Sequence, residues 1–102
     1  MTHPAPLRVR AVQCSIAWND VATNLEYIER IVQTHATGAD LIIFPETITT
    51  GFSSEAALLA DGEQGEVYHF LLELAKKYEV ALSGSYLSRV GEEVHNLFFL
   101  FE

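Results

Sequence analysis

The chain has little cysteine, little proline and few positive charges, and each shortage excludes a class of protein. Its one cysteine, Cys14, cannot form an internal disulfide, which favours a reducing compartment. Fourteen acidic residues against six basic ones give a net charge of −8, which repels phosphate backbones, so no nucleic-acid partner is expected. Apolar runs such as Leu41–Phe44 are too short to span a bilayer, and the first residues lack the apolar core of a signal peptide. We therefore expect a cytoplasmic protein without a membrane partner.

The composition that is present is that of a globular domain, with 49% hydrophobic and 20% charged residues among 102. A chain of this length buries roughly 60–65% of its unfolded surface, which allows one small core. Two of the three prolines, Pro4 and Pro6, lie in residues 1–6, which we expect to form a flexible arm. Residues 7–102 show no internal repeat and no linker.

Hydrophobic periodicity predicts a strand, a helix and a second strand in the first half of the chain. Alternating residues predict a strand over 7–14, and the almost wholly apolar residues 39–44 predict a strand buried on both faces. Between them, apolar residues at steps of three and four predict a helix of about four turns. Asp20 is a candidate N-cap, and Gly38 stands where a C-terminal stop is expected. This βαβ unit predicts two parallel strands with a right-handed crossover.

The second half predicts a helix followed by a hairpin. Residues 47–65 are rich in glycine and serine and predict an irregular segment with a short helix near Glu55–Ala60. Apolar residues of 66–78 follow the helical pattern, and residues 80–87 and 94–101 predict two strands joined by a tight turn. The fold class is therefore α/β. Because the last strand is rich in phenylalanine and nothing here covers it, we expect residues 7–102 to be an incomplete portion of a larger domain.

The end of the second predicted strand is the strongest candidate for a site. Ligands bind beyond the carboxyl ends of parallel strands in open α/β sheets. Pro45 ends the pairing of the strand, so Glu46 leaves the sheet at this edge. No lysine or arginine lies within ten residues of Glu46, so we expect a poorly hydrated carboxylate that accepts protons near neutral pH. The alternative on these residues alone is a solvated loop glutamate.

The surrounding sequence resembles the nitrilase superfamily of carbon–nitrogen hydrolases, in which a strand runs into Phe-Pro-Glu and the glutamate is the general base. The stretch 39–53 carries this motif. Residues 9–13 are similar to the first strand of the family, and Asn24 followed by Leu25 stands where its first helix carries Asn-Leu. The extension at 49–53 looks most like the omega-amidase-type branch. The resemblance covers nearly all of the chain.

The resemblance implies a four-layer αββα sandwich, of which this chain forms the N-terminal part. It implies hydrolysis of a small linear amide by a Glu–Lys–Cys triad, with a thioester intermediate and no cofactor. Of that triad only Glu46, the general base, stands in this chain, since Lys76 and Lys77 are out of register with the catalytic lysine. These 102 residues alone are therefore expected to be inactive, whereas the full-length protein is expected to be an amidase and a homo-oligomer.

The same resemblance makes Thr50, Gly51 and Phe52 candidates to line the substrate pocket. The alternative is that Gly51 only permits a turn and that Phe52 packs in the core. Asn96 either holds the final hairpin or approaches the site, and the former is favoured. Cys14 does not match the position of the family nucleophile and is interpreted as a small core residue.

Two further classes of function are alternatives to a hydrolase. A nucleotide-binding module of flavodoxin or Rossmann type needs a glycine-rich or hydroxyl-rich loop after its first strand. Residues 15–18 contain no glycine, so a dinucleotide site is not expected. The other alternative is a non-catalytic α/β fragment or half-domain that acts through association, which the phenylalanine-rich last strand favours. No metal site is expected, since the histidines show no paired ligand spacing. Amide, nitrile and carbamoyl hydrolysis share the features described, so the substrate stays open.

Overall fold

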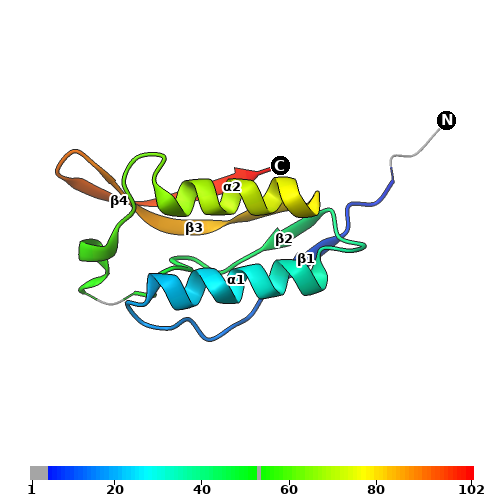
Figure 1. Ribbon diagram of the computed structural model, residues 1–102, viewed down its shortest axis with the longest axis horizontal. Coiled ribbons are helices and arrows are strands. Elements are labelled where there is room, and N and C mark those ends of the chain that lie inside the picture. Colours follow the sequence, from blue (N-terminus) through cyan, green and yellow to red (C-terminus); the bar gives the residue numbers. More distant parts are fainter. Residues whose placement is uncertain (1–4, 53) are drawn as a thin grey trace.

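The computed structural model describes residues 5–52 and 54–102, so most of the predicted arm at residues 1–6 lies outside the described residues. The elements follow the predicted order of strand, helix, strand, helix and hairpin (Figure 1). They are β1 (Val9–Ala11), α1 (Val21–His35), β2 (Leu41–Ile43), the 3₁₀ turn η1 (Ala56–Leu59), α2 (Glu66–Tyr78), β3 (Ala81–Val90) and β4 (Glu93–Phe101).

The strands form one sheet in the order β1-β2-β3-β4. The β1–β2 and β2–β3 pairs are parallel, and Leu41 of β2 lies between Val9 of β1 and Ala81 of β3. The carboxyl ends of β1 and β2 therefore meet at one edge, where β3 continues past them. The antiparallel β3–β4 hairpin is longer than predicted, because pairing continues to Val90 and Glu93 and leaves a two-residue turn.

An aspartate caps the start of each helix. The Asp20 carboxylate accepts hydrogen bonds from the Thr23 N–H at 3.1 Å and the Thr23 hydroxyl at 2.8 Å, and both hold the pKa of Asp20 below its usual value. Asp61 accepts from the N–H groups of Val67 and Tyr68 in the first turn of α2. These bonds satisfy N–H groups that have no partner within a helix, and they fix where α1 and α2 begin.

Both helices pack against the same face of the sheet. Figure 1 shows α1 and α2 running side by side over the strands. The apolar stripes predicted for the helices are buried there against one face of β2, β3 and β4. The core includes Leu25, Ile28 and Val32 from α1, Leu71 and Leu74 from α2, and Ile42, Leu82, Tyr86 and Phe99 from the sheet. Burial is also the main cause that raises the pKa of Tyr86 to about 12.

The opposite face of the sheet, here called the open face, is uncovered in the described chain. Several side chains that point away from the helices are exposed, among them Ile43 at 39%, Phe98 at 66% and Leu100 at 60%. The prediction that the strand of residues 39–44 is buried on both faces is therefore wrong for Ile43. The physical reason is that a single helical layer covers only one side of a sheet, which leaves two layers in all.

We predict that truncating the helix side of the core destabilises the protein strongly. Leu71 is fully buried between α2 and the sheet, so Leu71→Ala leaves a cavity and should lower the free energy of unfolding by about 2–5 kcal/mol. Leu58 in η1 is 82% exposed, and Leu58→Ala is the matched control, with an expected change below about 0.5 kcal/mol. Urea denaturation measures both; equal losses for the two variants would contradict the packing described.

Candidate active site

Glu46 follows directly after the last paired residues of β2. The Phe44 N–H still donates to the Ser83 carbonyl at 2.8 Å, so the strand is held to β3 up to this point. Gly84 lets the two backbones approach closely, because a Cβ atom there would lie 3.2 Å from both the Cβ and the carbonyl oxygen of Phe44. Pro45 has no N–H to donate, and the chain leaves the sheet. Glu46 is therefore fixed at the carboxyl edge of the parallel strands, as predicted.

The five residues 47–51, here called the Glu46 turn, hold the glutamate from its C-terminal side. The Thr47 N–H donates to the Ser85 hydroxyl oxygen of β3 at 2.9 Å, and the Ile48 N–H donates to the Ser85 carbonyl at 3.0 Å. The Gly51 N–H closes the turn on the Thr47 carbonyl at 2.8 Å. All five residues are buried, so these bonds are shielded from water.

A buried asparagine of α1 ties the Glu46 turn to the loop after β1. The Asn24 side chain accepts from the Ala17 N–H at 2.9 Å and donates to the carbonyls of Ala17 and Thr49, each at 2.7 Å. The Asn19 N–H donates to the Thr50 carbonyl at 3.0 Å. Two loops at the same edge of the sheet are thereby locked together, and Glu46 stands beside a rigid frame.

The Glu46 carboxylate has a defined hydrogen-bond partner. The Asn96 side-chain N–H of β4 donates to Glu46 Oε1 at 3.0 Å. The carboxylate is otherwise exposed, so the expectation that it loses its hydration is wrong for the described chain. Asn96, which pairs with Leu87, points to the open face of the sheet, which no second layer covers. Because the Glu46 carboxylate meets Asn96 there, it stays exposed to water.

The three pocket candidates lie in or directly after the Glu46 turn. Thr50 is fully buried and its hydroxyl donates to the Gly51 carbonyl at 3.0 Å. Gly51 has φ +78°, and a Cβ atom there would lie 3.5 Å from the Trp18 ring. Phe52 is 70% exposed and so does not pack in the core. Their contact with a substrate stays a prediction.

The remaining nucleophile and cation candidates are Cys14, Lys76 and Lys77. Cys14 packs against the core, and burial raises the pKa of its thiol, which is the opposite of what a reactive thiolate needs. Lys76 and Lys77 are exposed at the C-terminal end of α2. Within residues 5–52 and 54–102, no group of three or more histidine, cysteine or acidic side chains could hold a metal ion. No helix of the described part is long and apolar enough to cross a membrane.

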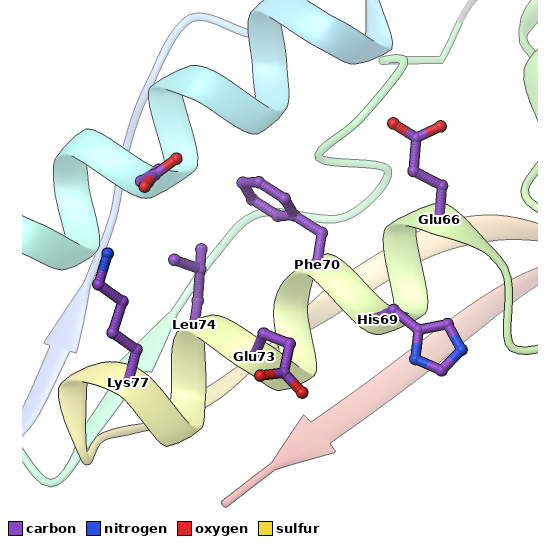
Figure 2. A pocket seen from close by; sticks show the side chains of 7 residues that line it. Glu66, His69, Phe70, Glu73, Leu74 and Lys77 are labelled. Atoms are coloured by element: carbon purple, nitrogen blue, oxygen red, sulfur yellow. The ribbon is translucent and has the colours of Figure 1, made fainter.

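A groove between the two helices is separate from the Glu46 edge. Figure 2 shows Phe70 and Leu74 of α2 projecting toward α1, with the carboxylates of Glu66 and Glu73 and the Lys77 amine around them. The groove has a volume of about 510 Å³, and none of the residues of the Glu46 turn lines it.

Three residues of the frame were not among the predicted site residues. Asn24 interrupts the apolar stripe of its helix, and a polar residue on a buried face is a signal of a specific hydrogen-bond role. Ser85 lies in a strand thinned by small residues, which signals close approach by another segment. For Asn96 the sequence left two roles open, holding the hairpin or approaching the site, and favoured the first; its side chain reaches Glu46, 50 positions earlier in the chain, which agrees with the second.

Known proteins resemble this chain over most of its length. The chain is 29% identical over 96 residues to the omega-amidase YafV of Escherichia coli, a match found in strains K12 and BL21-DE3. The match covers 94% of this chain and 37% of YafV, so the chain spans a little over a third of the length of this relative.

Solved structures give the same result. A CN-hydrolase superfamily protein from Xanthomonas campestris, XC1258, whose structure holds an arsenic adduct in the active site, superposes with a TM-score of 0.87 at 34% identity. That match covers 93% of this chain and 36% of XC1258. An amidase of the nitrilase superfamily from Nesterenkonia shares the fold, with a TM-score of 0.78 at 23% identity over 94% of this chain and 38% of that one.

A whole protein family also matches this chain. The Carbon-nitrogen hydrolase family matches residues 8–102, which is nearly the entire chain. The two-layer sheet-and-helix unit described above corresponds to the N-terminal portion of that fold. The chain belongs to the carbon–nitrogen hydrolase family.

Proposed function

We propose that Glu46 is the general base of an omega-amidase-like enzyme that hydrolyses a small linear amide. The observation that carries the proposal is the placement of the Glu46 carboxylate at the carboxyl edge of the parallel strands, held between the Ser85-anchored turn and Asn96. The nucleophilic cysteine and the lysine of the triad belong to parts of the protein outside these 102 residues. The chain alone therefore does not turn over amides.

The proposed chemistry needs a group that takes and returns one proton. Glu46 accepts the proton of the cysteine thiol, and the thiolate attacks the amide carbon while the lysine stabilises the oxyanion. The carbon–nitrogen bond breaks, and the nitrogen takes the proton from Glu46. Ammonia departs, and the acyl group remains on the cysteine as a thioester. Glu46 then takes a proton from water, whose oxygen attacks the thioester carbon. The carbon–sulfur bond breaks, the acid is released, and Glu46 returns the proton to the sulfur to restore the thiol.

The open face of the sheet supports the larger architecture of this proposal. Phe98 and Leu100 are exposed on it, and contiguous apolar surface of this kind is normally covered. We assign this face to the second sheet of a four-layer αββα sandwich. That sheet would also close the space above Glu46 and remove the water that now reaches it, since Asn96 lies on the same face.

The substrate class is assigned through the relatives. YafV is an omega-amidase, and its match spans the Glu46 turn. Thr50, Gly51 and Phe52 follow the base and are proposed to line the substrate pocket, which the exposure of the Phe52 ring supports. The protein is proposed to act in the cytoplasm, to need no cofactor and to assemble as a homo-oligomer.

We predict that Glu46→Gln abolishes turnover of a short omega-amide by the full-length protein. The glutamine keeps the shape and the contact distance but cannot accept a proton, so kcat should fall at least about 100-fold. The measurement is steady-state ammonia release. Glu26→Gln, at an exposed position of α1, is the matched control and should keep wild-type kcat. Near-normal turnover of Glu46→Gln would refute the role of the base.

A second prediction concerns the Glu46 turn. Ser85→Ala removes the acceptor of the buried Thr47 N–H, which should cost about 1–3 kcal/mol of stability and let the turn move. We expect kcat of the full-length protein to fall several-fold. Ser83→Ala, on the same face of β3, removes a hydroxyl that bonds to the Phe99 carbonyl and should leave kcat unchanged. Equal kcat values for the two variants would show that the Ser85 bond does not position the base.

A further inference from the structure

We propose that Asn96 is a positioning residue for the proposed base: its amide holds Oε1 of Glu46 so that Oε2 is free to take the proton. This inference rests on the proposed function. It is carried by the 3.0 Å hydrogen bond from the Asn96 side-chain N–H to Glu46 Oε1. The contact joins the residue pair across 50 positions of the sequence. Strands β2 and β4 are not neighbours in the sheet, since β3 lies between them.

The bond is not needed to hold the hairpin. The β3–β4 ladder runs through nine residue pairs, from Val90 with Glu93 to Leu82 with Phe101, and its backbone bonds do not use the Asn96 side chain. Asn96 is exposed, and its removal leaves no cavity in the core. The Asn96 side chain therefore contributes little to the stability of the fold.

The hydrogen bond from Asn96 is suited to fixing the orientation of the Glu46 carboxylate. A glutamate side chain has three rotatable bonds, and fixing one oxygen removes conformations in which the other points away from the thiol. An amide N–H donates to the carboxylate without carrying charge and without competing for its proton. A lysine or arginine at this position would set a full positive charge beside the carboxylate, whereas the neutral amide orients it without adding a charge.

The backbone frame completes the geometry. The Glu46 turn fixes the main chain of the glutamate through Ser85, and Asn96 fixes the far end of the side chain. The two anchors come from neighbouring strands, β3 and β4, which pair directly at Leu87 and Asn96. The β3–β4 hairpin therefore holds both the main chain next to Glu46 and its side-chain carboxylate.

The test compares Asn96→Ala and Asn96→Asp in the full-length protein. Asn96→Ala removes the donor and should lower kcat about 10-fold while KM changes less than about threefold, because orientation matters for proton transfer more than for binding. Asn96→Asp keeps the shape but sets a second carboxylate against Glu46, and it should lower kcat further than alanine does. A residue kept only for its shape would show the reverse order. His95→Ala, on the neighbouring residue of β4, is the control and should keep wild-type kcat.

The outcomes separate the two proposals. Melting temperatures within a few degrees of wild type show that the variants fold. If the wild-type protein releases ammonia and Glu46→Gln does not, but both Asn96 variants keep wild-type kcat, the positioning role is overturned and the base stands. If Glu46→Gln keeps wild-type turnover, the proposed function fails, and the role of Asn96 fails with it.

Discussion

The arrangement around Glu46 depends on one buried hydrogen bond, from the Thr47 N–H to the Ser85 hydroxyl. An unpaired N–H at a position as buried as Thr47 would cost about 1–3 kcal/mol, so the turn is stable only where a side-chain acceptor meets it. Thr47 adopts φ +49°, a conformation that a β-branched residue rarely takes without such support. The strain and the bond together set the direction in which the chain leaves β2, and with it the position of the carboxylate.

The packing of the helices on the sheet brings the two partners of this hydrogen bond together. The two helices bury one face of the sheet and fix the register that sets Ser85 beside the end of β2. The buried side chain of Asn24 in α1 forms hydrogen bonds to both the Glu46 turn and the loop after β1, and so links them. The asymmetry of the layers has a consequence for function. The helix face is complete within these residues, whereas the open face, on which the Glu46 carboxylate and Asn96 meet, is still hydrated.

Most of the fold could be predicted from the sequence because local signals and tertiary packing agree. The stripe of apolar residues from Val21 to Val32 and the cap at Asp20 gave the bounds of α1. The burial of β2 was not predictable, since an apolar run such as 41–43 does not reveal how many layers cover it. The position of Glu46 followed from Pro45, a rule of local geometry. The partners of Glu46 did not follow, because Ser85 and Asn96 meet it only through pairing between strands distant in sequence.

The most direct measurement is a crystal structure of the full-length protein. It tests whether the carboxylate that the turn and Asn96 hold on the open face is the group that deprotonates the nucleophile. We predict that a second sheet covers Phe98 and Leu100 and that a cysteine sulfur lies roughly 3–4 Å from Glu46 Oε2, or one water molecule away. A structure in which the Glu46 carboxylate stands in bulk solvent, with no cysteine or lysine facing it, would contradict the account.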